Sequence, residues 1–293
     1  MPTLAKKLMF NDGFVYNAKL ILIASQLQKL ANHNESRIAQ ITDGEWKYKD
    51  FEEDAVLSVT GSVEQHRGFF MGRLGHILVA ASSYTVETIP DVPLYGELSR
   101  IRNIDEEIYT VGTQGQVYVR TDTGWEHMDK EILGTPELHL EDIGGTAPDD
   151  LYVVGQKGDI LHYDGQQWRR IDSPTNRPFA SIKAVSRDLV YLCGNKGNLY
   201  RGNTHGWEYI GEPDFEGDYW SVEEFQGQIY AAHGTGIKVF DGTDLVPVDF
   251  ALDHPVDCHR LHASDGVLWS FGIDHILFFD GKKWEEVKCP MNV

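Results

Sequence analysis

The side chains that could do chemistry are few, and no known catalytic motif connects them. Four arginines, Arg100, Arg102, Arg187 and Arg260, lie in or near strands predicted to be innermost. A glycoside hydrolase with a tyrosine nucleophile could use such arginines to hold a substrate carboxylate, beside an acidic partner for the tyrosine. Because no motif joins the four, we predict ordinary solvated or ion-paired arginines, no catalytic residue and a protein that is not an enzyme.

Histidines and cysteines do not form a recognisable centre either. Metal binding needs two or three imidazoles that converge with a carboxylate. His254, His259 and His262 are close in sequence, but the last two are three residues apart on a predicted strand and therefore point to opposite faces. Cys193 lies among apolar residues and is predicted to be a small core residue. We expect no metal and no cofactor.

The elements that would position these residues recur along the chain. Tryptophans follow glycine-containing turns at Trp125, Trp168 and Trp207, and the series continues with Leu245 and Trp284. The spacing is about 40 residues, which is typical of a propeller blade. Trp46 stands about two such periods before Trp125, with one degenerate unit near position 86 between them. The repeat therefore predicts seven units.

Each unit contains four short strands rich in β-branched and aromatic residues, separated by Gly, Asn and Asp; in the fifth unit they are 181–186, 189–194, 198–202 and 206–211. Such meanders must stack face to face, and radial closure protects their ends. The predicted fold is all-β, a seven-bladed β-propeller of four-stranded antiparallel blades in a single domain. The approximate blade bounds are 1–51, 52–90, 91–130, 131–173, 174–212, 213–250 and 251–293.

Blade one is predicted to use strands at 14–17, 19–25, 37–42 and 45–51, with an insertion at 26–36. Because the first and last blades each hold four strands, we expect no blade shared between the chain ends, although 4–10 could add a latching strand. The repeat tryptophans are expected to wedge between blades. Glycines after the second strands, such as Gly155 and Gly194, are expected to permit turns with positive φ.

The turns Asp164-Gly165-Gln166-Gln167-Trp168 and 280–284 (DGKKW) resemble the Asp-box of sialidase-type (BNR) propellers. The Asp-to-Trp spacing is one residue shorter than in the Asp-box, and the preceding serine is absent. The chain is more broadly similar to bacterial BNR and YVTN-like propeller repeats. This resemblance implies a fold and no particular activity.

Composition narrows the class of partner. The chain has 45 acidic and 26 basic residues and a net charge of −19, which argues against binding nucleic acid or an anionic membrane surface. We find no signal peptide, and the longest apolar run, 20–24, is far too short to cross a bilayer. Three cysteines favour a reducing compartment, so we expect a cytoplasmic protein. Nothing in the acidic surface favours self-association, so we expect a monomer.

The acidic residues are concentrated in the long loops that join one blade to the next, at 48–56, 88–98, 129–139, 172–180, 211–219 and 249–257. These loops hold 17 acidic and 3 basic residues, and aromatic residues stand among them. We predict a partner-binding face formed by Asp50, Phe51, Glu52, Glu53, Asp54, Asp91, Tyr95, Glu97, Glu131, Phe179, Glu212, Asp214, Phe215, Glu216, Asp218, Tyr219, Asp253 and Asp257.

These features favour a non-enzymatic, protein-binding propeller whose acidic residues steer a basic partner. One specific form of the hypothesis is an immunity protein that neutralises a basic, nuclease-like bacterial toxin. The alternatives are a carbohydrate-binding or glycoside-hydrolysing propeller and a scaffold subunit of a larger assembly. The acidic loops could also be a solvated rim that only confers solubility.

Overall fold

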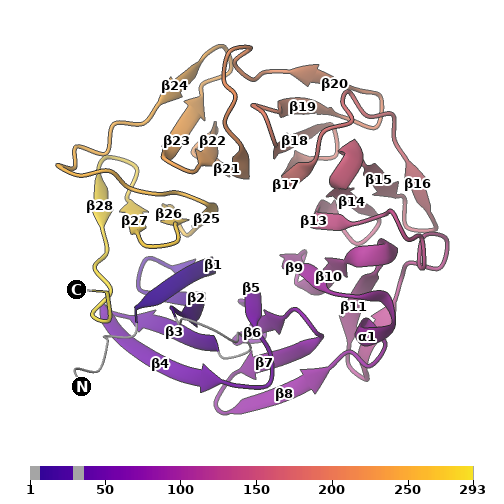
Figure 1. Cartoon of the computed structure of the whole chain (residues 1–293), viewed down its shortest axis with the longest axis horizontal. Coiled ribbons are helices and arrows are strands. Elements are labelled where there is room, and N and C mark those ends of the chain that lie inside the picture. The colour runs from indigo at the N-terminus through magenta and orange to yellow at the C-terminus, as the bar shows by residue number, and fades with distance from the viewer. Residues whose placement is uncertain (1–6, 29–35, 293) are drawn as a thin grey trace.

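The computed structural model describes residues 7–28 and 36–292. Its strands form seven four-stranded antiparallel sheets, which are arranged as blades around a central axis (Figure 1). In every sheet the strand order follows the chain, from an innermost first strand to an outermost fourth strand. The predicted seven-bladed propeller is therefore confirmed.

The strands of the first four blades are β1 (Leu8–Asn17), β2 (Leu20–Leu27), β3 (Ser36–Thr42) and β4 (Glu45–Phe51); β5 (Val56–Ser62), β6 (Arg67–Gly72), β7 (His76–Ala80) and β8 (Tyr84–Thr88); β9 (Leu98–Ile104), β10 (Glu107–Gly112), β11 (Val117–Thr121) and β12 (Gly124–His127); β13 (Leu140–Ala147), β14 (Asp150–Gly155), β15 (Ile160–Tyr163) and β16 (Trp168–Arg170).

The strands of the last three blades are β17 (Phe179–Ser186), β18 (Leu189–Gly194), β19 (Leu199–Asn203) and β20 (Gly206–Tyr209); β21 (Tyr219–Phe225), β22 (Gln228–His233), β23 (Gly236–Phe240) and β24 (Leu245–Pro247); β25 (Arg260–Ser264), β26 (Val267–Phe271), β27 (Ile276–Phe279) and β28 (Trp284–Glu286). The described helices are the short α1 (Val92–Tyr95) and the 3-10 turns η1 (Thr113–Gly115) and η2 (Gln156–Gly158). No helix in the described ranges has the length and apolarity to cross a membrane.

The hydrophobic core lies between neighbouring blades. Every residue of β14 and of β26 is buried, as expected for strands that are covered on both faces. The indole of Trp168 is buried, and its Nε1 donates a hydrogen bond of 2.7 Å to the carbonyl of Met128 at the end of the preceding blade. Trp125 reaches back in the same way to Glu87 at 3.0 Å. The wedging role predicted for these tryptophans agrees with this packing.

The first strand begins earlier than predicted. β1 starts at Leu8 and pairs with β2 from Leu8 opposite Leu27 onward, with an irregularity between Phe10 and Asp12. The polar stretch 11–13 is therefore a bulge within a strand and not a boundary. Residues 8–10 belong to this strand, whereas 4–6 and most of the predicted insertion at 26–36 lie outside the described residues.

The ring closes without a shared blade, as predicted. Blade one contains β1–β4 and blade seven contains β25–β28. The N–H of Phe10 donates to the carbonyl of Ile273 at 2.9 Å. The side chain of Asn292 accepts from the N–H of Leu8 at 2.8 Å and donates to the Leu8 carbonyl at 3.0 Å. Non-covalent contacts therefore join the two ends of the described chain.

The glycines that end the second strands do not have the predicted positive φ. Gly155 has φ −160°, which is ordinary extended backbone. A Cβ at Gly155 or Gly194 would lie 2.1 Å from the carbonyl oxygen of His139 or Pro178, respectively. These positions therefore need glycine because a joining loop packs against them. Positive φ occurs two and three residues later, at Lys157 (62°) and Gly158 (74°) in the same turn.

Candidate functional site

The loops between blades lie on one face of the ring, and they run over 52–55, 89–97, 128–139, 171–178, 210–218 and 248–259. They pack against the turns between second and third strands: the N–H of Gly115 donates to the Leu138 carbonyl at 2.8 Å, and the N–H of Gly197 donates to the Gly217 carbonyl at 2.7 Å. We call this surface, with these six loops and turns, the joining-loop face.

Four residues predicted to contact a partner are instead part of the core. The rings of Phe51, Phe179 and Tyr219 are at most 3% exposed. The carboxylate of Asp54 is fully buried and accepts the N–H of Leu74 at 2.7 Å. All four residues stand where a strand starts or ends, or directly beside it, so their side chains hold the blades and are not available on the surface.

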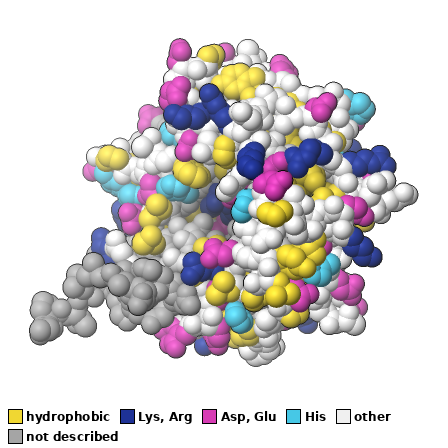
Figure 2. Space-filling model, turned by 45° about the vertical axis from the view of Figure 1, so that its right-hand side comes forward, with side chains coloured by type: hydrophobic (Ala, Val, Ile, Leu, Met, Phe, Trp, Pro, Cys, Tyr) yellow, Lys and Arg dark blue, Asp and Glu magenta, His cyan; other side chains and the backbone are white. Residues whose placement is uncertain are grey.

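Other predicted acids lie on the face but are paired. Among them, Glu216 is 3.1 Å from the ammonium of Lys196. The remaining pairs are Asp50 with Arg37, Glu97 with Arg73, Glu212 with Lys238, and Asp91 with His127. These contacts neutralise part of the charge that the sequence places in the loops, and in Figure 2 acidic and basic side chains are interspersed over the visible surface.

Two acids act as local braces. Asp218 accepts the N–H of Lys196 at 2.9 Å. Asp257 accepts hydrogen bonds from turn 272–275 and lies beside His259 and His275. Burial alone would raise the pKa of Asp257, but the hydrogen bonds from both histidines and from the backbone hold it well below its ordinary value. Both carboxylates therefore fix a loop to a neighbouring turn.

The predicted aromatic residues Tyr95 and Phe215 are half-buried. The ring of Phe215 lies beneath the ammonium of Lys238, 3.9 Å from the ring centroid. The carbonyl of Tyr95 accepts the hydroxyl of Thr113 at 2.8 Å. Part of each ring remains available on the joining-loop face.

Five predicted acids are exposed and, among the residues that the structure describes, make no ion pair; they are Glu52, Glu53, Glu131, Asp214 and Asp253. They come from four different loops. These are the residues of the predicted face that can interact with an approaching partner without first breaking an ion pair.

A cavity of about 560 Å³ lies at the centre of this face. Its walls come from the first residues of the innermost strands and from two turns, and they include Leu57, Leu98 and Trp220. The guanidinium groups of Arg100 and Arg260 line it as well. The cavity is of the size that proteins use for small ligands.

Below the cavity, each innermost strand contributes one polar residue at an equivalent position. In most blades the strand pairing is irregular near the start of the innermost strand, and the polar residue follows directly after this irregularity. These residues are Asp12, Ser58, Arg100, Asp142, Ser181, Ser221 and Arg260. Several accept an N–H from the innermost strand of the next blade; Asp142 accepts from Ile182 at 3.2 Å, and Ser221 accepts from Leu261 at 3.1 Å. The polar ring therefore seals neighbouring blades together around the axis.

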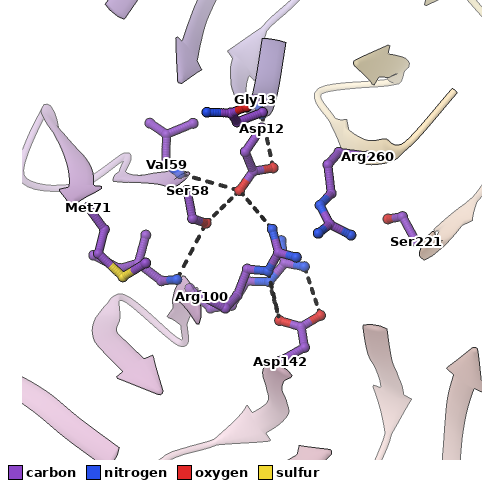
Figure 3. A network of polar contacts seen from close by, with 12 residues as sticks. Asp12, Gly13, Ser58, Val59, Met71, Arg100, Asp142, Ser221 and Arg260 are labelled. Carbon is purple, nitrogen blue, oxygen red and sulfur yellow. Dashed lines mark hydrogen bonds and ion pairs between the residues drawn. The ribbon is translucent and has the colours of Figure 1, made fainter. Parts of the chain in front are cut away.

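Ion pairs connect this ring (Figure 3). Arg102 donates two hydrogen bonds of 2.9 Å to the carboxylate of Asp142, and Arg100 donates one of 3.2 Å to Asp12. Burial alone would raise the pKa values of both aspartates, but the neighbouring guanidinium groups outweigh burial and hold these pKa values below the ordinary range. Both carboxylates are therefore ionised at neutral pH.

No protein-family model matches the chain. The immune protein Tsi7 of Pseudomonas aeruginosa is 31% identical over 292 residues, which cover 94% of this chain and 95% of Tsi7. The chain belongs to the Tsi7 family of immune proteins. This membership supports the prediction of a non-enzymatic protein.

Solved structures show the same fold as this Tsi7-family chain. YCF48 bound to D1 peptide superposes with a TM-score of 0.71 at 12% identity, covering 95% of both chains. The WD40 propeller domain of Doa1 superposes with a TM-score of 0.73 at 10% identity, also covering 95% of both chains. At these identities the likeness shows the propeller fold alone.

The Asp-Gly turns of the Tsi7-family chain are structural. The carboxylate of Asp164 accepts the N–H groups of Gln166 and Gln167, both at 3.0 Å, and Asp280 makes the equivalent bonds at 2.9 Å. Backbone hydrogen bonds hold the pKa of each aspartate below its ordinary value. These are Asx turns, which explains the resemblance to an Asp-box turn without a catalytic role.

In the Tsi7-family chain the rings of His254 and His275 stack with their centroids 5.7 Å apart, and His275 and His259 both lie beside Asp257. His254 is 3.1 Å from Glu286, and His262 accepts the N–H of Val15 at 3.3 Å. Burial lowers the pKa of His262 to about 4. Within residues 7–28 and 36–292, no group of three or more His, Cys, Asp or Glu side chains could hold a metal ion. Cys193 is fully buried in the core.

The sequence did not predict that arginines from different blades lie close together near the axis. Arg187 is exposed and pairs with Asp149, whereas Arg100 and Arg260 lie close together near the axis (Figure 3), and Arg102 shares the carboxylate of Asp142 with Arg100. An alignment of the first strands of all blades would have placed Arg100 and Arg260 at the same position. The residues that line the adjoining cavity include no tyrosine, so the arrangement does not offer the nucleophile that a hydrolase of the predicted kind would need.

Proposed function

We propose that this protein is an immunity protein that binds and neutralises a toxin, with the joining-loop face as the binding surface. The observation that carries the proposal is 31% identity to the immune protein Tsi7 over nearly the whole chain. The propeller supplies a rigid scaffold, and binding residues in proteins of this kind are concentrated on the loops that such a scaffold presents.

The joining-loop face suits this role because its loops differ widely between blades. The shortest runs over 52–55 and the longest over 128–139 and 248–259, whereas the turns on the opposite face are short. Exposed acids without an ion pair, such as Glu131 and Asp214, lie in these loops. A basic toxin domain, for example a nuclease that must itself attract phosphates, is the partner that such charges attract.

The experiment uses the protein encoded by the neighbouring gene, which we expect to be the toxin, purified with its active site inactivated. We expect stoichiometric binding that weakens as salt rises from 50 to 500 mM, because charged groups on exposed surfaces are screened. We also expect the active toxin to lose activity when one equivalent of this protein is added. If the neighbouring protein neither binds nor is inhibited, the immunity proposal is wrong.

A charge variant tests the face. The substitutions Glu52→Gln, Glu53→Gln, Glu131→Gln, Asp214→Asn and Asp253→Asn remove its unpaired charges, and we expect the association rate to fall by about tenfold or more. The matched control neutralises five exposed acids in turns of the opposite face, with Glu64→Gln, Asp122→Asn, Asp188→Asn, Asp244→Asn and Asp265→Asn. Equal losses from the two variants would show that the joining-loop face is not the docking surface.

A further inference from the structure

The cavity at the centre of the joining-loop face holds a guanidinium without a counter-ion. Arg260 donates from Nη1 to the backbone carbonyl of Trp220. Among the described residues, no carboxylate forms an ion pair with it. Figure 3 shows its guanidinium pointing toward that of Arg100, with no contact drawn to either aspartate. The side chain is half-buried and lines the cavity.

The neighbouring arginines have carboxylate partners. Arg100 pairs with Asp12 and Asp142, and Arg102 pairs with Asp142. The next ion pair in the channel, Lys183 with Glu223, is neutral by itself and belongs to a separate cavity at the opposite end. Among the described residues, Arg260 is therefore the one of these three arginines that forms no ion pair.

A charged group without a counter-ion, such as the guanidinium of Arg260, is costly to transfer out of bulk water. Burial and then the positive charge of Arg100 lower the pKa of Arg260 to about 9, so Arg260 stays charged at neutral pH but is disfavoured in that state. Arg100 also has a buried Nε without a hydrogen-bond partner. The Nε of Arg100 lies 3.6 Å from the carboxylate of Asp142, so an anion in the cavity would compensate Arg260.

The walls of the cavity restrict which anion fits. Leu57, Leu98 and Trp220 give it an apolar side. Glu97 and Glu141 also line it, and their negative charges oppose a ligand that carries several charges of the same sign. One negative charge is enough to pair with Arg260, and an apolar body fits the apolar side of the cavity.

We propose that this cavity binds a small organic monoanion, whose carboxylate is received by Arg260 and whose apolar body packs against Trp220 and Leu57. A guanidinium presents paired N–H donors that fit a carboxylate, and the volume of about 560 Å³ accommodates a molecule of this class. The site needs no toxin, so it goes beyond the proposed function and can be tested on the protein alone.

The probe is benzoate, compared with its neutral analogue benzamide and with phosphate, at constant ionic strength. We expect benzoate to raise the Tm of the full chain in a saturable manner and to give a measurable Kd by calorimetry, whereas benzamide and phosphate leave the Tm unchanged. Arg260→Met should weaken benzoate binding at least about tenfold, because it removes a charge-assisted pair. The matched control Arg187→Met removes an exposed arginine outside the cavity and should bind benzoate like the parent.

Equal responses to benzoate and benzamide, stronger binding of phosphate, or undiminished binding by Arg260→Met would each overturn the proposal. Without ligand, Arg260→Met should be at least as stable as the parent, because an uncompensated charge has been removed. If that variant does not fold, Ser99→Trp replaces it; Ser99 lines the cavity, and the larger side chain fills the space without removing a charge. Benzoate binding that survives Ser99→Trp would also overturn the site.

Discussion

The carboxylate of Asp142 joins three blades at a single side chain. It belongs to β13 in blade four, receives both hydrogen bonds of Arg102 from blade three, and accepts the N–H of Ile182 from blade five. The side chain is fully buried. Its removal would leave Arg102 buried with no carboxylate to balance it, which is a much larger cost than the loss of an exposed pair.

We therefore expect Asp142→Asn to lower the free energy of unfolding by about 3–5 kcal/mol, measured by urea denaturation at pH 7. The matched control is Asp149→Asn, which breaks the exposed pair with Arg187 and should cost less than about 1 kcal/mol. Similar losses for the two variants would contradict the central role of Asp142.

The stability loss caused by Asp142→Asn should depend on pH. The folded-state pKa of Asp142 lies below its ordinary value of 3.8, so its stabilising contribution is fully present above that pH and is lost as the pH falls further. The stability difference between the parent protein and Asp142→Asn should be constant from pH 7 to about 5 and should shrink below pH 4. A difference that widens in acid would mean that the sign of the pKa shift is wrong.

At the scale of elements, joining loops lie beside the ends of the second strands. The space available for a side chain near these strand ends differs between blades. A Cβ at Gly194 would lie 2.1 Å from the Pro178 carbonyl oxygen, whereas nothing lies within 4 Å of a Cβ at Gly234, the residue that follows the end of β22. In blade six the turn is a short hairpin that closes from His233 to Gly236, and the space around Gly234 admits a methyl group.

Gly194→Ala should therefore destabilise the protein by about 1–3 kcal/mol, since the loop before β17 must move to admit the methyl group. Gly234→Ala is the same substitution in the neighbouring blade and should change the stability by less than about 1 kcal/mol. Thermal unfolding of the two variants in parallel measures the difference. If Gly234→Ala were the more damaging variant, the packing explanation would fail.

At the scale of the whole molecule, the junction between blades seven and one depends on side chains. Asn292 bonds both backbone groups of Leu8. Asn292→Ala should lower the free energy of unfolding by about 1–3 kcal/mol, because it leaves two backbone groups without their partners. The exposed Asn176 provides the control: Asn176→Ala should have little effect in the same urea titration. No difference between the two would show that the ring closes without help from Asn292.

The blade plan could be predicted because hairpin turns and strand patterns are local in sequence. The sequence pattern places Phe179 and Tyr219 in loops, whereas they begin β17 and β21. A shift of one or two residues at a strand end decides whether an aromatic ring is exposed or buried. Arg100 and Arg260 come from blades three and seven, so their approach depends on ring closure. The side chains that reach the axis are also set by bulges near the start of innermost strands, which carry no clear sequence signal.

In the described part of the chain, joining loops cross six of the seven blade junctions, whereas the junction between β25 and β1 is held by non-covalent contacts such as those of Asn292 with Leu8. Because no joining loop spans this junction, we expect its opening to limit the kinetic stability of the ring. The cavity at the joining-loop face spans it, with Phe10 from blade one and Arg260 from blade seven in its lining. A molecule bound there touches both sides of the junction and lengthens the lifetime of the closed ring.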